Sequence, residues 1–380
     1  MTFRIAVVAA CIAACTAVAA AQAKPPEAKS AEAKLLIDIA LDNLTLQTPL
    51  RALSGGQRFS IKGDKGEVLI AGKTISATCV IKGKDHFLGL DANFDGKIDD
   101  KELVKLGGDP VVVRLNMAEK GAKQRQDLPI AVAKASLMVR ENTIVGCAGA
   151  FFAASSLRGP IAGTNIRLID ENLDGKITQD GEDAIAINSQ LAMPLLRIHQ
   201  LGNSFYELAI AEDGKTASAK PVELKLGQID APLLTAAGIK GIFMADATQK
   251  VAVDLLACKR VGMPAGDYKL IYGSIVSGKD TVTITPAIAA TSRTKRPDTA
   301  DGVYAIGGDA QNVMKLGAPL KLLFQGTFAG DQVGVGTQFA VSGCGGELYH
   351  AGGMEKPVVM LLEAQGKQPR MLSKETMEYG

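Results

Sequence analysis

The chain has 380 residues, of which 47% are hydrophobic, enough apolar side chain to build the cores of two or three domains. Its formal net charge is +2, and no block of five or six like charges occurs, which argues against nucleic-acid binding and against electrostatic recruitment to an acidic membrane. Trp is absent and only 4% of the residues are aromatic, which argues against a sugar-binding aromatic platform.

Residues 1–23 have the pattern of a bacterial signal peptide. Arg4 precedes an uncharged apolar run from Ile5 to Ala21, and Ala21 and Ala23 are the small residues expected before a cleavage site. Two alternatives stay open: a retained membrane anchor, for which a run of about 17 apolar residues is marginal, and a lipoprotein, because the residues before Cys15 resemble a lipobox. We expect an exported protein, periplasmic or extracellular, with no transmembrane span after signal removal and a lipid anchor at Cys15 as the alternative.

Residues 24–34 are rich in Pro, Ala, Glu and Lys and are predicted to form a tether. After them come short runs of β-branched and apolar residues broken by turn residues, without helical periodicity sustained over a dozen positions. This pattern predicts a mainly β fold of two or three antiparallel β-sandwich-like domains.

Two turns predict hairpins, one at Asp213-Gly214 and one at residues 264–267. Each lies between two strand-like runs: 205–210 with 216–220, and 251–257 with 268–272. A domain boundary is predicted near Pro221, because the acidic loops all precede it. This gives a β-rich region at 35–221 and a β-sandwich region at 222–380, with a further division at 293–301 as an alternative.

Residues 91–102 read DANFDGKIDDKE, which matches the EF-hand calcium loop at every defined position. Calcium prefers six to eight oxygen ligands, which side chains at alternate positions of a tight loop supply. Gly96 permits the sharp turn, and Ile98 is expected to pin the loop to the core or to a partner loop. The predicted ligands are Asp91, Asn93, Asp95, the backbone carbonyl of Lys97, Asp99 through water, and both carboxylate oxygens of Glu102.

Residues 170–183 read DENLDGKITQDGED and repeat the first features of that loop, with Asp170 in the place of Asp91. Here Gly181 stands where the closing Glu is expected. Asp180, Glu182 and Asp183 are candidates to replace it, and Asp183 is favoured because it adjoins the strand-like run 184–187. The predicted ligands are Asp170, Asn172, Asp174, the carbonyl of Lys176, and Asp183.

The resemblance to the EF-hand is confined to these two loops. The runs before them, 87–90 and 166–169, are of strand type, and only 100–106 could begin a helix. We therefore expect EF-hand-type loops inserted between strands, as in some exported bacterial proteins. That context predicts structural Ca²⁺ rather than a sensor, with a dissociation constant of about 10⁻⁴–10⁻³ M.

Four cysteines follow the signal segment and are disulfide candidates: Cys79, Cys147, Cys258 and Cys344. An even number in an oxidising compartment allows three connectivities, of which Cys79–Cys147 with Cys258–Cys344 suits a chain of two halves. Buried free thiols are the alternative. None of the four has the C-x-x-C spacing of a zinc or redox site.

No motif for nucleophilic or metal-assisted hydrolysis occurs, and the chain has only three His. The sequence therefore favours a non-enzymatic, exported calcium-binding scaffold with an unknown protein or envelope partner. The alternatives are a peptide- or glycan-binding module and a hydrolase with an unrecognised carboxylate site.

Overall fold

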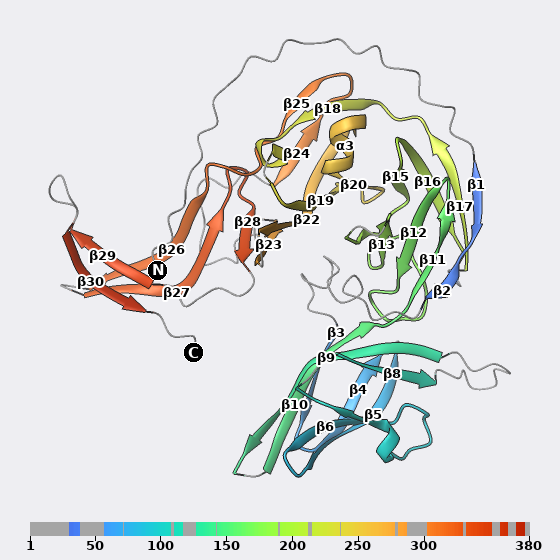
Figure 1. Cartoon of the computed structure of the whole chain (residues 1–380), viewed down its shortest axis with the longest axis vertical. Helices are drawn as coiled ribbons and strands as arrows, with labels where there is room; N and C mark the ends of the chain where they lie inside the picture. Colours follow the sequence, from blue (N-terminus) through green and yellow to red (C-terminus); the bar gives the residue numbers. More distant parts are fainter. Residues whose placement is uncertain are drawn as a thin grey trace.

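The computed structural model describes residues 30–38, 57–70, 72–107, 110–116, 127–141, 143–188, 191–211, 215–235, 237–277, 280–286, 302–329, 332–351, 358–363 and 370–376. The predicted signal peptide, Cys15, residues 24–29 of the predicted tether and the alternative division at 293–301 lie outside these ranges. Within them, strands dominate and are arranged in several mostly antiparallel sheets, which confirms the mainly β fold (Figure 1).

Two four-stranded antiparallel sheets form the first sandwich, in the orders β4-β5-β6-β7 and β3-β10-β9-β8. The strands are β3 (Gln57–Lys62), β4 (Lys65–Ile70), β5 (Lys73–Lys82), β6 (Asp85–Leu90), β7 (Leu103–Lys105), β8 (Val111–Asn116), β9 (Asp127–Arg140) and β10 (Thr143–Ala153). Buried and exposed residues alternate along β3 and β4, as expected for sheets with one face on a core. That core, called here the first core, contains Ile75, Leu88 and Leu115, together with Phe59 and Phe151, whose rings stack.

A five-stranded antiparallel sheet of order β14-β13-β12-β11-β2 adjoins this sandwich. Its strands are β2 (Leu36–Asp38), β11 (Ser156–Ile161), β12 (Thr164–Ile169), β13 (Ala184–Ile187) and β14 (Met193–Pro194). All four residues of β13 are buried, because successive side chains point to opposite faces and both faces are covered. Ala184 and Ala186 pack in the first core, whereas Ile185 and Ile187 pack in a second core.

A twelve-stranded sheet carries most of the remaining chain, in the order β1-β17-β16-β15-β20-β19-β22-β23-β28-β27-β26, with β24 also on β22. The strands are β1 (Ala31–Lys34), β15 (Ile198–Leu201), β16 (Ser204–Ile210), β17 (Thr216–Val222), β19 (Ile239–Asp246), β20 (Val251–Asp254), β22 (Gly266–Ser277), β23 (Asp280–Thr285), β24 (Val303–Ile306), β26 (Lys321–Ala329), β27 (Gln332–Ser342) and β28 (Leu348–Ala351). In Figure 1 this sheet arches above the first sandwich.

A third core lies between this long sheet and a smaller layer. That layer and the C-terminal hairpin comprise β18 (Leu226–Asp230), η2 (Pro232–Thr235), α3 (Leu255–Val261), β21 (Met263–Pro264), β25 (Gln311–Val313), β29 (Val358–Glu363) and β30 (Arg370–Thr376). No helix in the described part of the chain is long and apolar enough to cross a membrane.

The structure differs from the predicted chain organisation at three places. Ala31–Lys34, the end of the predicted tether, forms β1 and pairs with β17. Pro221 lies inside β17, and the long sheet contains strands from both sides of it, so the sheet is not divided there. The predicted hairpin around 264–267 is replaced by α3, and β22 pairs with β19 rather than β20. Strands β16 and β17 pair antiparallel, as predicted, whereas the predicted turn at Asp213-Gly214 lies outside the described residues.

Candidate functional site

The two acidic loops belong to a repeated structural unit. In the first unit, β5 and β6 form a hairpin that pairs Lys82 with Asp85. In the second unit, β11 and β12 form a hairpin that pairs Ile161 with Thr164, at the same distance along the chain before its loop. A third antiparallel strand follows each loop, β7 beside β6 and β13 beside β12. Both loops therefore connect strands, as predicted, and each returns the chain to its own hairpin.

The bond that closes each unit is also repeated. The amide of Leu106 donates to the carbonyl of His86 in the first unit, at 2.8 Å, and the amide of Asn188 donates to Asn165 in the second, also at 2.8 Å. The two acceptors occupy equivalent positions ahead of their loops, whereas the donor of the second unit comes later along the chain. The second loop therefore carries additional residues without changing the strands around it.

The first half of loop 91–102 winds around the carboxylate of Asp91. One Asp91 oxygen accepts from the amide of Asp95 at 3.1 Å, and the other accepts from the amide of Gly96 at 3.0 Å. Asn93 and Asp95 each accept from the amide two residues ahead, at 2.8 Å in both cases, the second of these from Lys97. The bonds accepted by Asn93 and Asp95 are Asx turns, in which a short polar side chain replaces a backbone acceptor.

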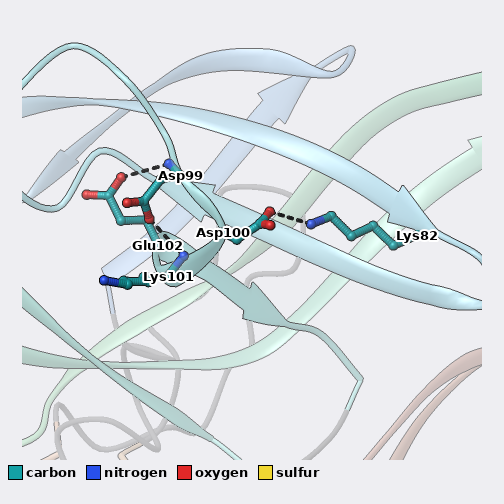
Figure 2. Close-up of polar contacts among 5 residues, drawn as sticks. All are labelled: Lys82, Asp99, Asp100, Lys101 and Glu102. Carbon is teal, nitrogen blue, oxygen red and sulfur yellow. Dashed lines mark hydrogen bonds and ion pairs between the residues drawn. The ribbon is translucent and has the colours of Figure 1, made fainter.

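Glu102 closes the first loop. One carboxylate oxygen accepts from the amide of Ala92 at 2.9 Å, and the other accepts from the amide of Asp99 at 3.1 Å. Asp99 caps the single 3-10 turn η1 (Asp100–Glu102), which takes the place of a longer exiting helix. Figure 2 shows Asp100 turned away from Glu102 toward Lys82, with which it forms an ion pair at 2.6 Å.

The second loop repeats the first winding bond for bond. Oxygens of Asp170 accept from the amides of Asp174 at 3.1 Å and Gly175 at 2.8 Å. Asn172 accepts from Asp174 at 3.0 Å, and Asp174 accepts from Lys176 at 2.8 Å. The sixth loop residue is a glycine at positive φ in both loops, 82° at Gly96 and 81° at Gly175, a conformation that glycine adopts without steric cost.

Asp183 takes the part of Glu102 in the second loop. It is fully buried, and its two oxygens accept from the amides of Glu171 at 3.0 Å and Thr178 at 2.6 Å. The other two candidates bond elsewhere. Asp180 accepts from the hydroxyl of Thr178 and is exposed, and Glu182 accepts from the side chain of Asn172.

The fourth residue of each loop has left-handed backbone but a different environment. Phe94 is 38% exposed, whereas Leu173 is completely buried in the first core. Loop 170–183 follows a strand of the five-stranded sheet, yet its Leu173 packs in the sandwich next to it. The second loop therefore lies at the junction between these two parts of the molecule.

The eighth residue of each loop is an isoleucine that anchors the loop. Ile98 packs over Gly89 of β6, beside Thr78 and Leu103, so that the first loop is held on its own sheet. Ile177 packs against the second core. Each loop is thus anchored to the sheets around it, one of the two arrangements predicted for Ile98.

Both loops concentrate negative charge. Loop 91–102 contains five acidic residues and two lysines, and loop 170–183 contains six acidic residues and one lysine. Burial raises the pKa of Asp170 to about 6 and that of Asp183 to about 7, against amide hydrogen bonds that lower it. Removing a carboxylate from water disfavours its charged form, and a nearby cation reverses that effect.

The donor set of both loops fits a calcium ion. Each carboxylate oxygen has two lone pairs, so an oxygen that accepts one amide hydrogen retains a second pair for a cation. Carboxylate, Asn side-chain and backbone carbonyl oxygens are the hard ligands that calcium prefers. No group of three or more His, Cys, Asp or Glu side chains is gathered as a metal site in the described ranges. The predicted calcium ligand sets differ from such a group because they also include Asn side-chain oxygens and backbone carbonyl oxygens.

The four cysteines are free thiols in the structure. The Cys258 thiol donates to the side-chain oxygen of Gln200 at 3.4 Å, and Cys344 is half-buried. Cys79 and Cys147 are both buried in the first core. The two predicted disulfides therefore stay predictions.

Sequence reasoning missed a group of buried polar residues away from the loops. Glu347 is 1% exposed and accepts from the amides of Gly317 and Gly345 and from the hydroxyl of Tyr349. Asp254 and His199 are also buried, each with one polar atom that has no partner among the described residues. The glycine-rich run before Glu347 was the one signal for the first of these, because a side chain at Gly343 would collide with its carboxylate and one at Gly345 would collide with the carbonyl of Lys315.

Comparison of the chain with protein-family models, with curated proteins and with solved structures finds no match. Function is therefore inferred from the residues of this chain alone. The repeated pair of acidic loops is the most specific chemical feature that the described residues contain.

Proposed function

We propose that this chain is an exported, non-enzymatic calcium-binding protein, in which calcium ions held by loops 91–102 and 170–183 stabilise a β-rich scaffold of the cell envelope or of the extracellular space. The observation that carries the proposal is the repeated winding of backbone amides around Asp91 and Asp170, closed by Glu102 and Asp183. Export rests on the signal-peptide pattern of residues 1–23.

In the first loop, Asp91, Asn93, Asp95 and Glu102 would provide side-chain oxygens, Lys97 its backbone carbonyl, and Asp99 a water-mediated contact. In the second, the corresponding groups are Asp170, Asn172, Asp174, Lys176 and Asp183. Hydrogen bonds from backbone amides already orient the carboxylates, so little reorganisation of the loops is needed for calcium binding. Calcium would offset the repulsion among the acids and the cost of burying Asp183.

The expected role of the metal is structural. A ligand that binds only the folded state stabilises it by mass action, and extracellular calcium is abundant enough to fill sites of modest affinity. The first ion would fix the β6–β7 connection. The second would fix the β12–β13 connection and hold Leu173 in the first core, and so join the sandwich to the five-stranded sheet.

Calorimetric titration of calcium into the chelator-stripped chain tests this proposal, together with thermal melts. Asp91→Ala and Asp170→Ala are each expected to remove one binding site and part of the calcium-dependent rise in melting temperature. Asp100→Ala is the matched control, because Asp100 pairs with Lys82 and is outside both predicted ligand sets. Absence of heat and of any change in melting up to about 10 mM calcium, well above the weakest extracellular sites, would refute calcium binding.

A further inference from the structure

Two cysteines from different sheets meet at the corner where β3 turns into β4. On one side of the corner, Cys147 of β10 is paired with Ile61 of β3. On the other side, the amide of Cys79 in β5 donates to the carbonyl of Asp64 at 2.7 Å. Only two residues separate Ile61 from Asp64, so the backbone brings both cysteines to one place.

The side chains of these cysteines point into the same core. Cys79 is 3% exposed and Cys147 is completely buried, and both belong to the first core between the two sheets of the sandwich. Interaction between the two thiols lowers the pKa of Cys79, whereas the same interaction, with burial, raises the pKa of Cys147.

We propose that Cys79 and Cys147 form a disulfide that joins the two sheets of the first sandwich when the chain folds in an oxidising compartment. The oxidant is a disulfide of a protein or small-molecule exchange partner. One cysteine attacks it as a thiolate to give a mixed disulfide, and the second displaces the partner sulfur. The chain loses two protons and two electrons, and the partner is reduced to two thiols.

The order of folding and oxidation follows from burial. A reagent reaches these sulfurs only while the two sheets are apart, because the closed sandwich leaves them almost without exposure. The bond therefore forms before or during closure of the sandwich, and once formed it resists reductants until the chain unfolds. Cys344 is only half-buried and lacks this protection.

Peptide mapping of the full chain tests the bond directly. The protein is exported through an oxidising secretory route, purified without reductant, denatured, alkylated and digested. The expected result is a peptide joining Cys79 to Cys147, with Cys258 and Cys344 alkylated or in other products. Complete alkylation of Cys79 and Cys147, or pairing of either with another cysteine, would overturn the proposal.

A variant measurement tests the contribution of the bond to stability, with calcium saturating and with calcium removed. The double variant Cys79→Ala/Cys147→Ala is expected to melt about 10 °C lower than the oxidised protein, and adding a reductant should not lower its melting temperature further. Cys258→Ala/Cys344→Ala is the control, in which a reductant should still lower the melting temperature. If the first variant does not fold, the peptide map of the unaltered chain still decides. Since the map does not depend on calcium, it can fail or succeed independently of the proposed function.

Discussion

Asp183 accepts hydrogen bonds from the same two loop positions as Glu102, although its side chain is shorter and its loop is longer. The donors are the second and ninth residues of each loop: Ala92 and Asp99, and Glu171 and Thr178. Each acid directly precedes its strand, but the pairing differs: Leu103 lies opposite Gly89, whereas Ile185 lies opposite Leu168, the equivalent position before the second loop. Measured from these paired residues, Asp183 lies one residue nearer the loop than Glu102 does. That shift compensates for the missing methylene, so the carboxylates have equivalent partners.

This equivalence predicts equal effects of neutralising the two acids. Glu102→Gln and Asp183→Asn keep the side-chain length but remove the charge and one of the two carboxylate oxygens. Each is expected to weaken calcium binding at its own loop by about tenfold or more and to leave the other loop unchanged. Isothermal titration of both variants and of Asp100→Asn, the exposed control, measures this. A normal second site in Asp183→Asn would show that Asp183 is not a ligand.

The contrast between Leu173 and Phe94 predicts different effects of truncation at the same loop position. Leu173→Ala removes a completely buried side chain from the first core and is expected to cost about 2–5 kcal/mol of unfolding free energy. Phe94→Ala removes a side chain that is 38% exposed and is expected to cost less than about 1 kcal/mol. Urea unfolding of both variants at saturating calcium makes the comparison. Similar losses of unfolding free energy would contradict the packing of the second loop, through Leu173, in the core of the first sandwich.

The candidate loops could be predicted from sequence because their geometry is local. The side-chain-to-backbone hydrogen bonds of these loops join residues two to five positions apart, so the spacing of Asp91, Asn93, Asp95 and Gly96 is enough to specify the winding. The position of Asp183 in place of the closing Glu was predictable because Asp183 immediately precedes a strand-like run. Its burial, and the packing of Leu173 in a neighbouring core, depend on distant residues and carry no local signal.

The organisation of the sheets was predicted less well, since strand partners are chosen by burial across the whole fold. Ala31–Lys34 is polar enough to suggest a tether, yet its backbone completes the edge beside β17. The helix α3 is only seven residues long, too short to show a helical period, and Asp254 starts it by accepting from the amide of Leu256. The predicted turn at 264–267 gave no indication of this insertion.

Gly89 predicts a steric test of the anchor of the first loop. A Cβ atom at this position would lie 2.6 Å from Cγ2 of Ile98 and 2.8 Å from Cγ2 of Thr78, both on stiff β-branched side chains. Gly89→Ala is therefore expected to destabilise the fold by about 1–3 kcal/mol and to weaken calcium binding in loop 91–102 alone. Gly89→Ala/Ile98→Ala removes one of the colliding groups. Its loss of stability should be smaller than the sum of the two single losses, and strict additivity would exclude the contact.

Two buried groups outside the loops predict opposite dependences of stability on pH. Burial raises the pKa of Asp254 from its ordinary 3.8 to about 6, so protonation favours the folded state. Its stabilising contribution is present below pH 3.8 and is lost as the pH rises toward 6. Burial lowers the pKa of His199 from 6.5 to about 4, so its contribution is present above pH 6.5 and is lost as the pH falls toward 4. Each change amounts to about 3 kcal/mol, and in the wild type the two largely cancel.

Substituting each group separately is expected to reveal the hidden slopes. Asp254→Asn retains an oxygen to cap α3 but does not titrate, so its stability relative to wild type should rise as the pH increases from 4 to 6. His199→Gln should become more stable relative to wild type as the pH falls from 6.5 to 4. The contribution of the acidic loops to the pH dependence is the same in variant and wild type, so it cancels in these differences. The nearby Cys258 stays protonated because burial raises its pKa. Urea unfolding across this range measures both differences, and a difference that does not vary with pH would mean that the group titrates alike in the folded and unfolded chain.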